Sequence, residues 1–161
     1  MPDPTASIGH VQGLALRTAK GEPVTLVEQV TAELGQGLRE EGRGAKNKRG
    51  VTLLAAGQWP AVCQALGREV PWTARRANVL IDCQTLLQHL GKTLCIGDEV
   101  RLEATLETVP CSHIESLTPG LSEALKPEGR GGLCCRVVAG GVIRVGDAVR
   151  VEDTLPASAA G

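Results

Sequence analysis

Glycine and proline divide this chain into many short segments. There are 20 glycines and 9 prolines among its 161 residues. Both residues interrupt regular structure and mark turns, so the chain is expected to fold as many short elements rather than a few long helices. The pattern predicts a mainly β protein with one or two short α-helices.

Three segments read directly as strands. Residues 10–17 and 79–81 are short apolar runs, and residues 101–109 alternate polar and apolar side chains, as a strand with one buried face does. Residues 24–38 fit two structures, because their apolar residues recur at helical spacing while residues 25–31 are rich in the β-branched residues that favour strands. The secondary structure of that segment stays open.

Two segments carry helix signals. Residues 59–67 have Pro60 in the first turn and Gly67 just past the expected end, which is the usual order of these residues at helix termini. A second short helix is expected at residues 121–125, and Pro127 would stop it.

One stretch of sequence is echoed later in the chain. Residues 94–103 resemble residues 143–152, and each copy has a Gly-Asp pair between an apolar strand end and a new alternating strand. Such pairs form tight hairpin turns. Two copies are too few for a repeat architecture, so we interpret them as two similar turns of one barrel.

Length and composition exclude several classes of protein. The chain has the size of one domain, and its 17 basic and 18 acidic residues give no field that would attract nucleic acid or a membrane. It has two tryptophans and no phenylalanine or tyrosine, so it lacks base-stacking platforms. The N-terminus has no signal-peptide pattern and no run is long enough to span a membrane. We expect a cytoplasmic protein that binds neither nucleic acid nor membranes.

The six cysteines are expected to be free thiols, because a cytoplasmic domain of this size keeps its thiols reduced and needs no disulfides. Five of them lie in apolar surroundings and are interpreted as small core residues. Cys111 differs, because a strand through residues 109–115 would place Cys111, His113 and Glu115 on one side. Cys111 is then a candidate nucleophile. His113 is either its general base or a histidine on the rim of the site.

Two basic segments are candidates for binding an anion. Arg75, Arg76 and Asn78 offer two guanidinium groups and an amide, unless the arginines are a solvated surface pair. Residues 42–50 are rich in glycine and basic residues, and Lys48 and Arg49 at their end could grip a phosphate. The alternative for this second segment is a solvated run of charge.

Several of these motifs, taken in order, resemble the MOSC domain, the C-terminal domain of molybdenum cofactor sulfurase. The resemblance covers residues 8–153, leaving residues 1–7 and 154–161 as tails. The motifs that carry it are Lys48-Arg49-Gly50-Val51-Thr52-Leu53-Leu54, Arg75-Arg76-Ala77-Asn78-Val79-Leu80-Ile81, Leu94-Cys95-Ile96-Gly97-Asp98, Pro110-Cys111-Ser112-His113-Ile114-Glu115, and Arg130-Gly131-Gly132 followed by Gly141-Val142-Ile143-Arg144-Val145-Gly146-Asp147.

The resemblance implies a barrel-like fold, a site for the molybdenum cofactor and a single functional cysteine at Cys111, which would ligate molybdenum if the cofactor is bound. Arg76 and Asn78 match the Arg-x-Asn motif of the family, with Arg75 as a helper and Lys48 and Arg49 nearby. The chain departs from the family pattern over residues 39–46. It also lacks the separate domain that binds pyridoxal phosphate in the full-length sulfurase, so that cofactor is not expected.

Three functions follow from the resemblance and stay open. The first is a protein that binds the molybdenum cofactor, stably or transiently, or carries sulfur on Cys111 for the maturation of that cofactor or of a metal-sulfur centre. Its partners would be the cofactor, the proteins that make it, and sulfur donors. The second is a molybdenum-cofactor-dependent reductase of N-hydroxylated substrates. The third is a non-catalytic binding scaffold. The sequence leaves enzymatic activity undecided.

Overall fold

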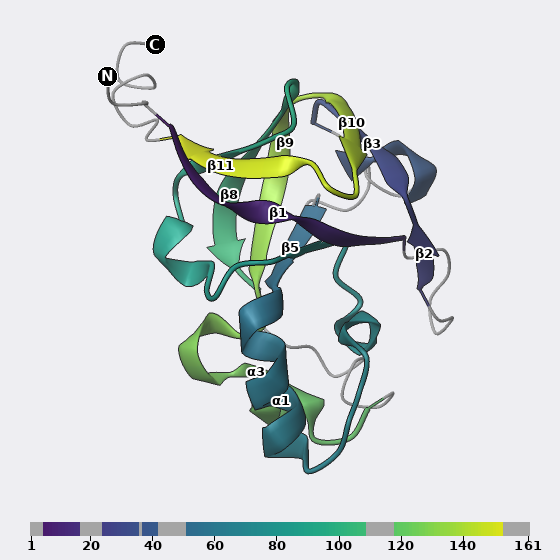
Figure 1. Cartoon of the computed structure of the whole chain (residues 1–161), viewed down its shortest axis with the longest axis vertical. Coiled ribbons are helices and arrows are strands. Elements are labelled where there is room, and N and C mark those ends of the chain that lie inside the picture. The colour runs from purple at the N-terminus through teal and green to yellow at the C-terminus, as the bar shows by residue number, and fades with distance from the viewer. Residues whose placement is uncertain (1–4, 17–23, 36, 42–50, 109–117, 153–161) are drawn as a thin grey trace.

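A computed structural model of the chain describes residues 5–16, 24–35, 37–41, 51–108 and 118–152. The fold is a β-barrel with a pair of helices packed at one end (Figure 1). Seven strands form a closed ring in the order β1, β11, β7, β8, β9, β5, β6 and back to β1. The expected mainly β fold with one or two short helices is confirmed. The barrel strands are β1 (Thr5–Leu16), β5 (Val51–Ala55), β6 (Val79–Ile81), β7 (Thr93–Ile96), β8 (Val100–Glu107), β9 (Leu133–Ala139) and β11 (Ala148–Glu152).

Neighbouring strands of the ring are antiparallel except β5 and β6, which are parallel, with Leu53 opposite Val79. Parallel neighbours need a crossover connection between them. Residues 56–78 make this crossover and contain helix α1 (Trp59–Leu66). A parallel pair is buried on both faces, and the side chains of β5 and β6 are accordingly all buried.

The segment left open by the sequence, residues 24–38, forms strands. β2 (Thr25–Val27) extends the barrel sheet by pairing with β1, whereas β3 (Gln29–Glu33) and β4 (Gly37–Leu38) join β10 (Gly141–Arg144) in a second, three-stranded sheet. The strand preference of the β-branched residues 25–31 therefore prevails over the helical spacing of the apolar residues. The helical spacing fails because Leu34, which would share a buried face with Val30 and Leu38, is 67% exposed.

Both expected helices are present. α1 ends at Gly67, which adopts the left-handed conformation with φ 75°, and α3 (Leu121–Leu125) packs against α1 through Val62 and Leu121. On the outer face of the parallel strand pair, Leu54 and Leu80 are covered by Trp59 and Trp72. Single turns of 3-10 helix occur at Arg39–Glu41, Ala56–Gln58, Trp72–Arg75, Leu87–His89 and Pro127–Gly129.

The interior of the barrel is filled by medium-sized aliphatic side chains from all seven strands, among them Leu14, Leu53, Ile81, Leu94, Leu102, Leu133 and Val149. The five cysteines of the described residues are free, and all but Cys83 are buried. Cys134 and Cys135 belong to the buried core, as expected. No helix among the described residues combines the length and apolar character needed to cross a membrane.

The two Gly-Asp turns of the sequence echo lie side by side, because β11 pairs with β7. The Gly97 N–H donates to the Ala148 carbonyl oxygen at 3.0 Å, and the Arg150 guanidinium donates to the Gly97 carbonyl oxygen at 3.1 Å. The interpretation as two similar turns of one barrel is confirmed.

Gly132 makes the tightest backbone approach to the barrel wall. A Cβ atom there would lie 1.9 Å from the Leu53 carbonyl oxygen, and its φ is +91°. We expect Gly132→Ala to lower the free energy of unfolding by at least about 3 kcal/mol or to prevent folding. Gly67→Ala is the matched control, since its φ is +75° and nothing lies near its Cβ position; it should cost about 1 kcal/mol. Equal losses in denaturant unfolding would contradict this account.

Candidate functional site

Arg75 and Arg76 lie at the end of the crossover between the two parallel strands. Their side chains are only 6% and 9% exposed, so the alternative of a solvated surface pair is wrong. Arg75 is the last residue of the 3-10 turn Trp72–Arg75, and the Arg76 N–H closes that turn on the Thr73 carbonyl oxygen at 2.9 Å. The crossover thus places two consecutive buried arginines just ahead of β6.

Arg76 has a strained backbone. Its φ of 62° places it in the left-handed region, and it is the one non-glycine residue there among the residues described. Such a conformation costs of order 1–3 kcal/mol and is retained where the surrounding structure enforces it, often at functional sites. Arg76 lies between the 3-10 turn and the start of β6, so the strained residue is at the junction of these two elements.

Arg75 is fixed by a carbonyl oxygen far along the chain. Its Nε donates to the Gly131 carbonyl oxygen at 3.0 Å. The Thr108 hydroxyl donates to the same oxygen and lies 3.2 Å from the Gly132 carbonyl oxygen. The Thr108 N–H also donates to the Gly132 carbonyl oxygen, at 3.0 Å. The end of β8, the end of the crossover and the Gly-Gly turn before β9 therefore meet at one point.

Asn78, two residues after Arg76, ties three barrel strands together. It is fully buried; its amide oxygen accepts from the Thr52 N–H at 3.0 Å, and its amide nitrogen donates to the Ala15 carbonyl oxygen at 3.1 Å. Backbone hydrogen bonds run parallel to these, since Asn78 N–H donates to the Thr52 carbonyl oxygen and Ala15 N–H to that of Asn78. The buried amide thus holds β1, β5 and the start of β6 in register.

The remaining predicted site residues lie outside the described part of the chain. Cys111 and His113 fall in residues 109–117, and Lys48 and Arg49 fall in residues 42–50. Their flanking residues are described. Thr108 touches the Gly131 carbonyl oxygen that Arg75 binds, and Val51 begins β5, one residue before the strand contact of Asn78 with Thr52.

Sequence reasoning missed the role of Thr108, which carries no local signal. The Gly-Gly pair held a usable clue. A Cβ at Gly131 would lie 2.9 Å from the Thr108 hydroxyl oxygen and 3.9 Å from Arg75 Nε, so a side chain would intrude on both contacts. The glycine at this position shows that two other chain segments approach its backbone closely.

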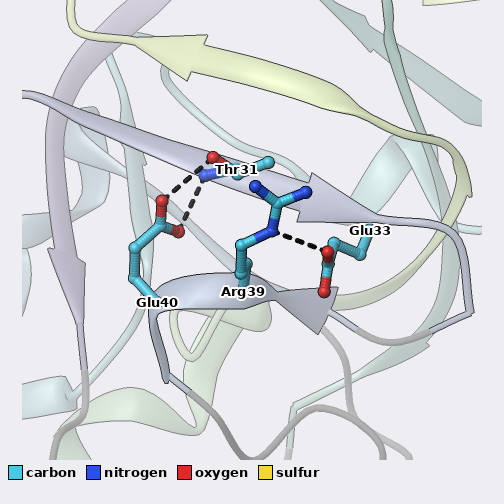
Figure 2. A network of polar contacts seen from close by, with 4 residues as sticks. All are labelled: Thr31, Glu33, Arg39 and Glu40. Atoms are coloured by element: carbon cyan, nitrogen blue, oxygen red, sulfur yellow. Dashed lines mark hydrogen bonds and ion pairs between the residues drawn. The ribbon is translucent and has the colours of Figure 1, made fainter.

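A polar network precedes the basic segment 42–50 (Figure 2). The Glu40 carboxylate accepts from the N–H and the hydroxyl of Thr31, at 2.8 and 2.9 Å, and the Arg39 guanidinium donates to Glu33 at 2.7 Å. β4 pairs with β3 only at Ala32 and Glu33, so Glu40 supplies the acceptor that the strand edge otherwise lacks at Thr31. The network anchors the point from which residues 42–50 depart.

Other charged surfaces fit an anion less well. A hollow of about 650 Å³ between the two Gly-Asp turns is lined by residues of both signs, among them Asp98, Glu99, Asp147, Arg144 and Arg150. Their charges offset one another. Among the described residues no group of three or more metal-ligating side chains is found. The buried arginines are therefore the better candidate for binding chemistry.

Comparison with known proteins gives a family and a fold. The family model of the MOSC domain matches residues 40–150. The solved structure of the YuaD protein from Bacillus subtilis has a TM-score of 0.73 at 18% identity, covering 91% of this chain and 96% of that one. YiiM from Geobacillus stearothermophilus gives 0.64 at 18% identity, with 92% and 75% covered. YiiM from Escherichia coli gives 0.65 at 14% identity, with 94% and 69% covered. No curated protein matches the chain.

Asn78→Ala should lower the free energy of unfolding by about 2–4 kcal/mol, because it leaves the Thr52 N–H and the Ala15 carbonyl oxygen buried without their partner. Gln64→Ala, on the exposed side of α1, is the control and should change stability by no more than about 0.5 kcal/mol. Urea unfolding of both variants measures this. A loss below about 1 kcal/mol for Asn78→Ala would show that the amide does not hold the strands.

The Glu40 network gives a pH-dependent prediction. Burial works to raise the pKa of the Glu40 carboxyl group, but the hydrogen bonds from Thr31 and the charge of Arg39 outweigh it, so the net pKa is lowered. A lowered pKa means that the stabilisation is present above the unfolded-state value and is lost as the pH falls through the folded-state value. Glu40→Gln should therefore destabilise the protein by at most about 1 kcal/mol at pH 7. The difference from wild type should shrink as the pH falls below the unfolded-state pKa of about 4.3 and vanish below the lowered folded-state pKa. A difference independent of pH between 7 and 3.5 would contradict this.

Proposed function

This chain belongs to the MOSC domain family, and from that premise we propose that it binds the molybdenum cofactor or carries sulfur on Cys111 for the maturation of that cofactor or of a metal-sulfur centre. The observation that carries the proposal is the burial of two consecutive arginines, Arg75 and Arg76, the second of them on a strained backbone. The proteins that make the cofactor and those that donate sulfur are the proposed partners, and the cytoplasm is the proposed location.

Two buried guanidinium groups fit an anionic ligand. Removing such charges from water costs several kcal/mol each, and that cost is offset where anions or several acceptors surround them. Each guanidinium has five N–H donors in a planar fork that matches a phosphate bidentately. One donor of Arg75 is committed to Gly131. The phosphate group of a pterin cofactor is a ligand of this chemistry, and we propose that Arg75 and Arg76 hold it while Asn78 keeps the strands behind them in place.

Chain connectivity supports a role for the predicted cysteine. Cys111 follows Thr108 by three residues, so their Cα atoms are separated by at most about 11 Å, and Thr108 touches the carbonyl oxygen that Arg75 binds. Lys48 and Arg49 likewise precede Val51 by three and two residues. We propose that positive charge from these groups favours the thiolate form of Cys111, which is the nucleophile and the metal ligand.

The described cysteines are less suited to this role, because four of the five, Cys63, Cys95, Cys134 and Cys135, are buried. Burial raises the pKa of the Cys83 thiol to about 11, and burial likewise raises the pKa of Cys95 and of Cys135. A thiol held protonated neither attacks sulfur nor ligates a metal at neutral pH. The cysteine chemistry is therefore assigned to Cys111.

The proposed sulfur transfer is a thiol exchange. His113 accepts the proton of the Cys111 thiol, and the resulting thiolate attacks the outer sulfur of a donor persulfide. The bond between the two donor sulfurs breaks, and its electron pair leaves with the donor thiolate. Cys111 then carries the persulfide. A bound molybdenum cofactor would supply a metal that accepts sulfur or the cysteine ligand itself.

The test is the molybdenum content and released pterin fluorescence of protein purified anaerobically from a cofactor-competent host. We expect pterin in wild type and at least a tenfold loss in Arg76→Gln, because a charge-assisted contact contributes about 1.5–3 kcal/mol. Arg136→Gln is the matched control: Arg136 is exposed on β9 and pairs with Glu103, so its loss should not change the pterin content.

Cys111→Ser separates the two roles of the thiol. Molybdenum lost with Cys111→Ser but present in wild type would make Cys111 a ligand and call for reductase assays on N-hydroxylated substrates. A persulfide found by mass spectrometry on Cys111 in protein without pterin would support the carrier role. Protein with neither pterin nor persulfide after exposure to a sulfur donor would overturn the proposal and leave a binding scaffold.

A further inference from the structure

We infer that Thr108 is a positioning residue for the Arg75 guanidinium and acts through the Gly131 carbonyl oxygen, which accepts from both side chains. The inference rests on the proposed function, because Arg75 is one of the two arginines assigned to the anion. It adds a residue that contacts no ligand and instead sets the direction in which Arg75 points.

The geometry joins three distant segments through one acceptor. Arg75 Nε lies 3.0 Å from the Gly131 carbonyl oxygen, and the Thr108 hydroxyl donates to the same atom. The Thr108 backbone N–H donates to the next carbonyl oxygen, that of Gly132, at 3.0 Å. Both side chains are at least nine-tenths buried, so water does not compete for the shared acceptor.

A carbonyl oxygen has two lone pairs, and here each has a donor. With the Thr108 hydroxyl on one of them, Arg75 Nε is confined to the other. Because the guanidinium group is planar, fixing the direction of the Nε–H bond restricts the planes in which the two terminal nitrogens can lie and so restricts where they aim. These nitrogens form the fork that grips a phosphate edge.

The turn that bears the shared acceptor cannot move aside. A Cβ at Gly131 would lie 2.9 Å from the Thr108 hydroxyl oxygen and 3.0 Å from the Thr108 carbonyl oxygen, and a Cβ at Gly132 would lie 1.9 Å from the Leu53 carbonyl oxygen. The Gly-Gly pair is thus wedged between the ends of β8 and β5. Ligand sites depend on such support, because a binding group displaced by about 0.5 Å or tilted by 10–20° loses much of its contribution.

The experiment compares valine substitutions at two nearby threonines whose hydroxyls both donate to a backbone carbonyl oxygen, the buried Thr108 and the more exposed Thr105. Thr108→Val removes the hydroxyl and keeps the shape. Thr105→Val is the control, because the Thr105 hydroxyl, three residues earlier and within β8, donates at 3.1 Å to the Cys134 carbonyl oxygen of β9 rather than to that of Gly131. Thr108→Ser restores the hydroxyl and is the rescue variant. The probe is inorganic pyrophosphate, titrated calorimetrically at low ionic strength and constant pH.

We expect Thr108→Val to weaken pyrophosphate binding about tenfold, as the loss of one buried hydrogen bond does, while Thr108→Ser and Thr105→Val stay within about twofold of wild type. In an Arg75→Gln background, Thr108→Val should have no further effect, because its action passes through Arg75. A residue that served only stability would not show this coupling, and unfolding curves of all variants exclude a loss of folded protein as the cause.

The outcomes separate this inference from the proposed function. Unchanged binding by Thr108→Val, or an equal loss with and without Arg75, would overturn the positioning role while Arg75→Gln still weakened binding and upheld the anion site. Wild type without affinity for pyrophosphate, or undiminished binding by both Arg75→Gln and Arg76→Gln, would overturn the anion site itself, and the positioning role with it.

Discussion

The parallel pairing of β5 with β6 is the constraint on which the rest of the structure depends. Every other neighbouring pair in the barrel is antiparallel, but a parallel pair forces the chain to leave one end of the barrel and return to the opposite end. The crossover carries α1 and the turn with Arg75 and Arg76 to the outside of these two strands, where Trp59 and Trp72 cover the outward-facing leucines. The strand topology therefore determines where Arg75 and Arg76 lie, and the local sequence determines only the conformation of their turn.

The site carries costs that the barrel offsets. A left-handed Arg76 and two buried guanidinium groups are each unfavourable, and a fold selected for stability alone would avoid all three. They persist because hydrogen bonds hold the neighbouring residues in place. Asn78 is hydrogen-bonded to β1 and β5, and Arg75 donates to the Gly131 carbonyl oxygen. The packing and hydrogen bonding of the barrel strands offset the free-energy cost of the strained Arg76 backbone and of the two buried charges.

Local patterns predicted the elements and failed to predict their partners. The alternation of residues 101–109 and the proline and glycine signals of residues 59–67 identified β8 and α1 within about two residues. Residues 24–38 stayed open because helical spacing and β-branching conflict there, and pairing with β10 and β1 settles the conflict. The burial of Arg75 and the role of Thr108 could not be predicted, since their common acceptor lies 56 and 23 residues away and nothing in a local window reports such a contact.

Burial in the core also lowers the reactivity of the cysteines that lie there. Without phenylalanine or tyrosine, the barrel interior depends on medium-sized side chains, and thiols such as that of Cys135 fill it as small apolar groups. Burial keeps the proton on such a thiol and removes it from redox and metal chemistry. A reactive cysteine must therefore lie where the barrel wall ends, near positive charge. Among the described residues Thr108, just past the end of β8 and sharing an acceptor with Arg75, meets that requirement, and the proposed Cys111 comes three residues later in the sequence.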